Sequence, residues 1–565
     1  MVRRDPCRTE AKTCQPKKIH KLNSDCPCVI KGLINLIEQR MTADDLKRNL
    51  WLHVANLVAK GTCYIRPGGV MRNCYFIGIL CIIFSLCLCG CSSKAPVDSQ
   101  VHIQAVENNL KPALYIKGES VPAMNILDRM AHYKVPGVSV AVINDGEIEW
   151  AKGYGIKEAG SNDPVTPETL FQAASISKPV AALGALHLVE KGVLDLDAPV
   201  NDKLRSWKVP ENEFTEKEKV TLRRLLTHSA GLTVHGFPGY KTTKEIPTTI
   251  QVLDGEKPTN TPAIRVDLIP GSQWRYSGGG YTVAQLLVTD VSGKPFRDYM
   301  KETVLNPAGM VNSTYQQPIS PEMAVQAASA HRSNGKVIPG KWHVYPELAA
   351  AGLWTTPTDL CRFAIELQKS FVGKLNKVIS QKMTQQMLTP GIGDWGLGPS
   401  LSGSGEAKAF SHGGGNEGFR CQLFAFIEGG RGAAVMTNSD RGSEIAAEIL
   451  RSIASVYDWP AYQSKDVAIV DVDPSVLNAY VGDFRLADQP KMPVLVSIDE
   501  GHLVVKSMAT GKMELLPMSE TEFVYLDGGI FITFVQGDEG NFDQMKVKIA
   551  GSSMEMVLNR KKDDE

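Results

Sequence analysis

A serine and a lysine three residues apart form the most informative pair in this chain. Ser175 and Lys178 open an apolar run over residues 179–189, and a helix there would carry both side chains on one face. A serine hydroxyl is a weak nucleophile until a neighbouring base takes its proton. A lysine serves as that base when burial lowers its pKa. The alternative is an ordinary exposed helix start, but the small apolar neighbours of Ser175 favour a packed nucleophile and base.

Two later segments add groups of the kind that such a pair needs. Tyr276 begins a Tyr-Ser-Gly-Gly-Gly segment about a hundred residues after Ser175. His412 begins a His-Gly-Gly-Gly segment that precedes an apolar, strand-like run at 421–427. Taken singly, the segment at Tyr276 is typical of a turn with a packed ring, and the segment at His412 is typical of a bend. Their order along the chain favours one site built from all three segments.

The three motifs together resemble the set found in penicillin-binding proteins and serine β-lactamases: S-x-x-K, then a tyrosine loop, then an H-x-G triplet. Further segments similar to the β-lactamase-related serine hydrolases lie at 136–142, 225–232, 270–275 and 351–360. The resemblance covers roughly residues 119–458. The most similar patterns are those of class C β-lactamases, D,D-carboxypeptidases, D-aminopeptidases and β-lactamase-like esterases.

This resemblance implies an acyl-enzyme mechanism. Ser175 would attack a carbonyl, while Lys178 and Tyr276 share the work of general base and pass the proton to the leaving group. We expect a cationic lysine to lower the pKa of the Tyr276 phenol and hold it near its ionised form. The resemblance also assigns the oxyanion donors to the backbone N–H groups of Ser175 and Gly415.

The remaining predicted binding residues differ from the usual pattern of the family. His412, followed by Gly413 and Gly414, stands where many relatives have lysine, so we expect it to orient a substrate carboxylate or the tyrosine hydroxyl. Because imidazole titrates near neutrality, a pH dependence is expected there. Gly278 replaces an asparagine that contacts the acyl side chain of the substrate in many members. Both differences favour an esterase, D-amino-acid amidase or peptidase over efficient β-lactam hydrolysis.

Other interpretations remain open at this point. One is a class C-type β-lactamase or D,D-carboxypeptidase, and another is a catalytically silent penicillin-binding sensor or cell-wall interaction protein. The presence of all three reactive side chains argues against a catalytically silent protein. His228, in a leucine-rich turn, is expected to be a packed histidine bonded to backbone rather than a catalytic one. No cofactor or metal is implied, and the expected partner is a small ester, amide or peptidoglycan-derived peptide.

Composition and cysteine usage limit the function classes further. The chain has 565 residues with 61 basic and 61 acidic side chains, so no excess of positive charge points to nucleic acid. Ten of the twelve cysteines lie at or before Cys91, which argues against a disulfide framework in the remainder. We expect Cys361 and Cys421 to be buried thiols.

The N-terminal region predicts attachment to a membrane. Residues 75–88 form an apolar run that is short for a spanning helix but suits a signal-peptide core. Residues 88–91, Leu-Cys-Gly-Cys, resemble a bacterial lipobox in which Cys91 is lipidated. This predicts a lipid anchor on the periplasmic side of a bacterial membrane, with Ser92 favouring the outer membrane. The basic extension at 1–70 either precedes the true start at Met71 or is a cytoplasmic segment before a membrane anchor.

The sequence predicts an α+β fold followed by a small all-β barrel. Strands at 138–143 and 147–152, joined by an Asn-Asp-Gly turn, precede a helical middle, strands at 421–427 and 432–437, and a helix at 443–457. By resemblance, this is an antiparallel sheet flanked by helices, with a helical subdomain. Short alternating runs near the C-terminus resemble an appended lipocalin-like domain. The expected boundaries are 71–91 for the signal or anchor, 92–118 for a linker, 119–458 for the hydrolase, 459–472 for a second linker and 473–565 for the barrel.

Overall fold

The computed structural model describes residues 99–486, 492–507, 511–537, 540–550 and 555–561. The predicted lipidation site at Cys91, the signal or anchor at 71–91 and the basic extension at 1–70 lie outside these residues. Within the described ranges, no helix combines the length and apolar character needed to cross a membrane. The location of the protein in the cell therefore stays a prediction.

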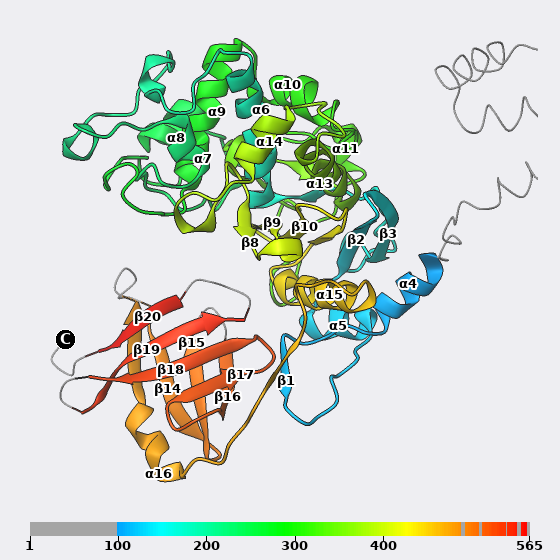
Figure 1. Ribbon diagram of the computed structural model, residues 1–565, viewed down its shortest axis with the longest axis vertical. Coiled ribbons are helices and arrows are strands. Elements are labelled where there is room, and N and C mark those ends of the chain that lie inside the picture. The colour runs from blue at the N-terminus through cyan, green and yellow to red at the C-terminus, as the bar shows by residue number, and fades with distance from the viewer. Residues whose placement is uncertain (1–98, 487–491, 508–510, 538–539, 551–554, 562–565) are drawn as a thin grey trace, which may run out of the picture. The chain divides into compact units, whose positions relative to one another are not determined.

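A six-stranded antiparallel sheet forms the centre of the hydrolase region (Figure 1), with the strand order β3-β2-β11-β10-β9-β8. Its strands are β2 (Gly137–Asn144), β3 (Glu147–Gly155), β8 (Ser400–Ser402), β9 (Ala409–Asn416), β10 (Phe419–Phe426) and β11 (Gly432–Thr437). The predicted hairpin joins β2 to β3, and Asp145 and Gly146 both take the positive φ angles that its two-residue turn requires. Alternation along β2 divides the core, because Val138, Val140 and Val142 face one cluster and Ala141 and Ile143 the other.

Helices cover both faces of this sheet. On one face α15 (Gly442–Val456) packs with α5 (Ile126–Tyr133) and α4 (Ser99–Glu107), and on the other lies α13 (Pro357–Phe371). Cys361 and Cys421, on α13 and β10, are buried free thiols as expected. The sheet and its helices confirm the predicted α+β class.

Two segments expected to be linkers contain regular structure. Within 92–118 the chain forms α4 and then β1 (Leu114–Ile116), which pairs in parallel with β12 (Lys465–Val467) from the second expected linker. Ile103 and Val106 of α4 are buried in the same cluster as α15. The linker assignment is therefore wrong over these elements, since two apolar side chains on a short helix give little periodic signal until a partner covers them.

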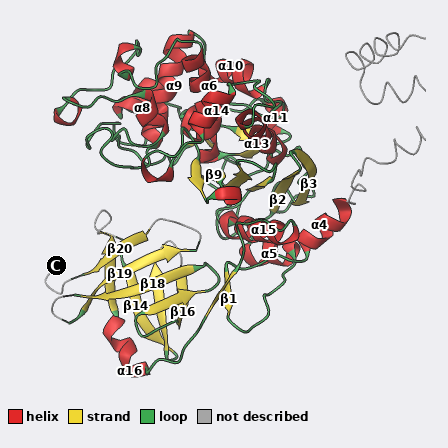
Figure 2. Ribbon diagram, viewed as in Figure 1, coloured by secondary structure: helices red, strands yellow, loops and turns green. Residues whose placement is uncertain are grey.

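The helical subdomain surrounds α6 (Ser177–Glu190), which confirms the helix predicted at 179–189 (Figure 2). Eleven of its fourteen residues are buried, as expected for a helix that is apolar all round. Its other helices are α7 (Leu222–Leu226), α8 (Thr249–Asp254), α9 (Gly278–Ser292), α10 (Phe296–Met300), α11 (Pro321–Ala324), α12 (Leu348–Ala351) and α14 (Gln381–Met387). Short strands pair as β4 (Phe171–Gln172) with β7 (Trp354–Thr355) and β5 (Tyr240–Lys241) with β6 (His343–Val344).

The C-terminal region is a closed barrel of eight strands, which confirms the all-β prediction. After α16 (Pro474–Leu477), the strands are β13 (Gly482–Leu486), β14 (Val494–Asp499), β15 (His502–Ser507), β16 (Gly511–Pro517), β17 (Glu522–Tyr525), β18 (Ile530–Gln536), β19 (Phe542–Ile549) and β20 (Glu555–Arg560). Aromatic side chains, among them Tyr480, Phe484 and Phe534, are buried in its core cluster. This is the filled interior of a small barrel. The specific likeness to a lipocalin stays a prediction.

Candidate active site

A sharp strand-to-helix turn places Ser175 at a pocket. The segment runs from β4 through one 3₁₀ turn, η1 (Ala174–Ile176), directly into α6. Ala174 takes a φ of +49°, a left-handed conformation that is uncommon for a residue with a side chain. Gly414 of β9 lies against this turn, and a Cβ atom there would stand 2.2 Å from the carbonyl oxygen of Ala173. Close backbone packing therefore fixes the position of the serine.

Lys178 lies beneath Ser175 and is only 2% exposed. Its Nζ lies 3.0 Å from the Ser175 Oγ and donates a second hydrogen bond, 2.9 Å long, to the carbonyl oxygen of Ala350 on α12. Burial lowers the pKa of Lys178 to about 7, because an ammonium group loses its hydration there. A large fraction of this amine is therefore neutral near pH 7, and only the neutral amine can accept a proton.

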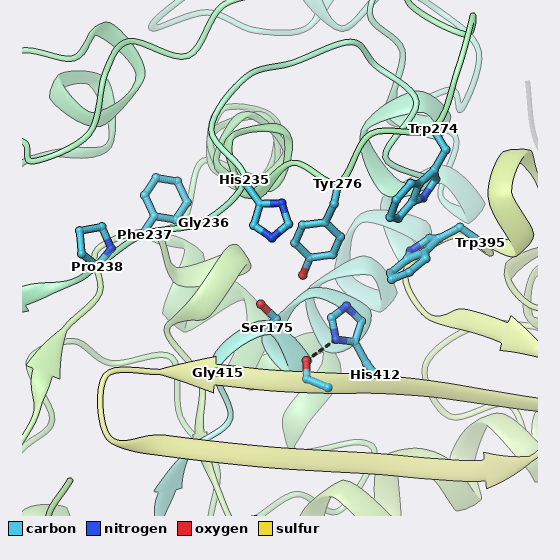
Figure 3. A pocket seen from close by; sticks show the side chains of 11 residues that line it. Ser175, His235, Gly236, Phe237, Pro238, Trp274, Tyr276, Trp395, His412 and Gly415 are labelled. Atoms are coloured by element: carbon cyan, nitrogen blue, oxygen red, sulfur yellow. Dashed lines mark hydrogen bonds between the residues drawn. The ribbon is translucent and has the colours of Figure 1, made fainter. Parts of the chain in front are cut away.

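Tyr276 completes the cluster, immediately before α9. Ser277 caps that helix by accepting a hydrogen bond from the Gly280 N–H (2.9 Å), which fixes the backbone next to the tyrosine. The ring centre lies 4.9 Å from the Lys178 Nζ, and the hydroxyl points toward Ser175 (Figure 3). The structure thus brings the three predicted side chains together.

The protonation state expected for Tyr276 is wrong. Burial raises the pKa of its phenol well above 10, and the neighbouring Ser175 hydroxyl offsets only part of this effect. The expected help from a lysine charge is weak, because burial also lowers the pKa of Lys178 itself. Tyr276 is therefore a neutral phenol with a proton to donate, and Lys178 is the group suited to act as the base.

The ring of His412, on β9, lines the pocket and carries one hydrogen-bond acceptor. Its Nδ1 lies 2.6 Å from the carbonyl oxygen of Gly413, so Nδ1 carries the hydrogen. Its Nε2 is buried and has no hydrogen-bond partner among the described residues. Burial and the nearby Lys178 lower the pKa of His412 to about 3. The prediction of a titration near neutrality is therefore wrong, and the ring is neutral at physiological pH.

The predicted glycines have different positions. Gly413 and Gly415 line the pocket, whereas Gly414 is buried against the turn that carries the serine. Gly278 is buried at the start of α9 and is not a lining residue. A Cβ atom there would stand 2.9 Å from the Phe237 ring. The expectation that Gly278 lies at the substrate surface is wrong, because the loop at 235–238 covers it.

The pocket has a volume of about 740 Å³ and is mostly aromatic. Its lining residues are Ser175, His235, Gly236, Phe237, Pro238, Trp274, Tyr276, Trp395, His412, Gly413 and Gly415 (Figure 3). Sequence reasoning did not identify four of the aromatic side chains, namely His235, Phe237, Trp274 and Trp395. They come from three loops, since His235 and Phe237 share one and Trp274 and Trp395 lie on two others. Only Trp274 gave a signal, since it lies in the 270–275 segment just before Tyr276.

His228 is a packed histidine, as expected, and it also supports the tyrosine. Its buried ring accepts a hydrogen bond at Nδ1 from the Ser277 N–H (3.1 Å). The same ring stacks on Tyr276 with 4.1 Å between the ring centres. Burial holds its pKa well below the ordinary value, so the ring is neutral. His228 therefore holds both the backbone and the ring of the tyrosine loop.

The α+β fold with a serine, a buried lysine and a tyrosine in one pocket is that of a penicillin-binding-protein-like serine hydrolase. The family model described as "Beta-lactamase" matches residues 124–458, and the chain belongs to this family.

Known proteins agree with this membership. Penicillin-binding protein 4* of Bacillus subtilis is 26% identical over 423 residues, which are 71% of this chain and 90% of that protein. Esterase EstB of Burkholderia gladioli is 30% identical over 31% of this chain and 46% of its own length. A penicillin-binding protein homologue from Pyrococcus abyssi has a solved structure with a TM-score of 0.52 and 22% identity, covering 77% of this chain and 98% of that one. This last likeness shows the fold.

Proposed function

We propose that this serine hydrolase cleaves esters or amides through an acyl-enzyme on Ser175. The observation that carries the proposal is the 3.0 Å contact between the Ser175 Oγ and the Nζ of Lys178, whose pKa is lowered to about 7. A neutral amine at this distance can take the serine proton as the hydroxyl attacks a carbonyl. Three neutral aromatic side chains around Tyr276 keep water away from it, namely His228, His235 and Trp395.

The proposed reaction has two steps. In acylation, the Ser175 oxygen bonds to the carbonyl carbon while Lys178 takes its proton, and the backbone N–H groups of Ser175 and Gly415 stabilise the oxyanion. As the bond to the leaving group breaks, Tyr276 gives its proton to the leaving atom and regains one from Lys178. In deacylation, a water bonds to the carbonyl carbon of the acyl-enzyme and gives a proton to Lys178. The bond between that carbon and the Ser175 oxygen then breaks, Tyr276 protonates the serine oxygen and regains a proton from Lys178, and the acid is released. All groups then have their starting charges.

We infer an ester or amide substrate rather than an efficiently cleaved β-lactam. The similarity to a protein named as an esterase supports this, as does the difference from the usual family pattern at His412. The clustered serine, lysine and tyrosine argue against a silent sensor, since each is placed to react. A β-lactamase or D,D-carboxypeptidase remains the alternative that a substrate panel tests.

The nucleophile is tested by covalent labelling. We expect a fluorophosphonate probe to attach to Ser175 in the full chain, and we expect Ser175→Ala to abolish both labelling and turnover of p-nitrophenyl butyrate. Ser177→Ala is not a neutral control, because the Ser177 hydroxyl accepts a hydrogen bond from the Leu353 N–H. Exposed Ser333 offers a better control, and Ser333→Ala should label normally. Undiminished turnover by a folded Ser175→Ala variant would remove the assignment.

We also propose that Cys91 is lipidated and holds the hydrolase on the periplasmic side of a bacterial membrane. The lipobox-like residues 88–91 after an apolar run support this. In a bacterial host, Cys91→Ser should move the protein from the membrane fraction to the soluble fraction and remove the mass of the acyl chains from its N-terminal peptide. Cys89→Ser should leave both unchanged. An unaltered N-terminal peptide in the wild type would contradict the proposal.

A further inference from the structure

One polar atom in the pocket has no use in the reaction proposed above. The Nε2 of His412 is buried, lacks a hydrogen-bond partner among the described residues and belongs to a ring that lines the pocket. Because Nδ1 donates its hydrogen to the Gly413 carbonyl, Nε2 carries a lone pair. A buried acceptor left unpaired costs free energy, so a ligand that donates a hydrogen bond to it gains affinity. A ligand that brings another lone pair or a negative charge is repelled.

No lining residue supplies a free positive charge to offset this repulsion. The Lys178 amine lies behind the serine, where it bonds to Ser175 and to the Ala350 carbonyl. Arg420 of β10 is the cation beside Gly415, but it donates to the carbonyl oxygens of Asn416 and Phe419 and pairs with Asp440. A carboxylate bound beside His412 would therefore lose its hydration without gaining a cation, and the indole N–H of Trp274, a lining donor that lacks a partner among the described residues, is uncharged.

The wall beside His412 is aromatic. The rings of Trp274 and Trp395 lie 5.5 Å apart between centres, and Trp395 meets His412 edge-on at 5.5 Å. The indole N–H of Trp395 is already used by the carbonyl of Gly398 (3.0 Å). The indole N–H of Trp274 has no hydrogen-bond partner among the described residues. The faces of the two rings offer apolar surface to a planar or aliphatic group, next to the acceptor on His412.

His412 lies on the side of the pocket where the leaving group departs. Its ring centre is 6.2 Å from that of Tyr276, whose hydroxyl points toward Ser175 (Figure 3). In the reaction proposed above, this hydroxyl protonates the leaving atom. The rings around Tyr276 that a substituent on the leaving group can meet are those of His412, the two tryptophans and His235, whose ring centre is 4.8 Å from that of Tyr276.

We propose that this pocket selects esters and amides whose leaving group is uncharged, apolar in its body and equipped with an N–H or O–H that donates to the Nε2 of His412. A leaving group with a carboxylate at that position is rejected. This inference rests on the proposed function, because it assigns the leaving-group side from the role of Tyr276. In this proposal His412 determines specificity for the leaving group, and a lysine at the same position would favour a leaving group with a carboxylate.

The test compares three phenylacetyl esters that differ in one substituent of the leaving phenol. The leaving groups are 3-hydroxybenzamide, which has a donor, its N,N-dimethyl amide, which is uncharged but has none, and 3-hydroxybenzoate, which is anionic. With the full chain at pH 7.5, we expect kcat/KM to be at least tenfold higher for the benzamide ester than for the benzoate ester, with the dimethyl amide between them. Spontaneous hydrolysis rates, measured in parallel, correct for differences between the phenols.

The matched variants are His412→Lys and His132→Lys. The first places a cation in the pocket and should reverse the preference toward the benzoate ester. The second adds a lysine at an exposed position of α5 and should leave the ratio unchanged. A second measurement uses the wild type alone: free 3-hydroxybenzamide should inhibit more strongly than 3-hydroxybenzoate, so the test survives even if His412→Lys fails to fold.

The outcomes separate the two proposals. Ser175-dependent turnover with equal or faster cleavage of the benzoate ester, or stronger inhibition by 3-hydroxybenzoate, overturns the inference on His412 and leaves the nucleophile in place. An unchanged ratio in a folded, active His412→Lys variant overturns it as well. Turnover that persists in Ser175→Ala overturns the proposed function itself.

Discussion

Replacing Lys178 with methionine should cost activity and increase stability at low pH. The folded protein holds the pKa of this amine at about 7 instead of its ordinary 10.5, because the site removes the ammonium from water. One pKa unit corresponds to about 1.4 kcal/mol, so the burial costs about 5 kcal/mol wherever the unfolded chain is protonated. Methionine has a similar length and no charge to desolvate. It also removes the base, which should lower kcat by about 10² to 10⁴.

The sign of the pH dependence follows from proton binding. Between pH 7 and 10.5 the folded state binds fewer protons at Lys178 than the unfolded state does, so the stability of the wild type rises with pH in this window. The variant lacks this contribution. Its advantage over the wild type should therefore fall by about 3 kcal/mol between pH 6 and pH 9.5. A pH-independent loss of about 1–3 kcal/mol is added, because the Ala350 carbonyl loses its hydrogen bond.

Urea unfolding followed by tryptophan fluorescence measures this difference in the full chain. Seven of the eight tryptophans lie between Trp150 and Trp459 and none lies in the barrel, so the signal follows the hydrolase region. Lys203→Met, at an exposed position, is the matched control and should shift stability equally at all pH values. A difference between Lys178→Met and the wild type that stays constant from pH 6 to pH 9.5 would refute the assignment of a largely neutral buried lysine.

Three other predictions concern the same site. First, kcat/KM for a neutral ester should rise with pH to a plateau, with an apparent pKa of about 7 that belongs to Lys178. It should not fall between pH 8 and 9.5, because burial raises the pKa of Tyr276. A bell-shaped profile centred below pH 8 would contradict this. Second, His228→Phe keeps the ring contact with Tyr276 but leaves the Ser277 N–H without its acceptor. The free energy of unfolding in urea should therefore fall by about 1–3 kcal/mol, and kcat should fall by a larger factor than KM rises. Unchanged stability would show that the hydrogen bond contributes nothing. Third, Gly414→Ala forces the turn before the nucleophile to move, which should cost about 1–3 kcal/mol and slow fluorophosphonate labelling. Gly413→Ala, whose added methyl meets only the end of a glutamine side chain, should leave the stability unchanged. Equal stabilities of the two variants would contradict this.

The sequence by itself determined the elements whose signals are local. The serine and lysine sit on one helical turn because their spacing is three residues, and α6 is buried because its residues are apolar on every side. The hairpin of β2 and β3 could also be predicted from the sequence, since an Asp-Gly pair between two alternating runs favours a two-residue turn with positive φ angles. The order of the three motifs then indicated one site, although no local pattern measures the distances between them.

Tertiary structure alone decided how those side chains are protonated and what they meet. The pKa of Lys178, the neutral phenol of Tyr276 and the acceptor on His412 all follow from burial and from partners that lie far away in the chain. The aromatic wall comes from separate loops, and α4 is held by packing against α15. Desolvation depends on every atom that surrounds a group, so residue types and spacing cannot specify it before the chain has folded.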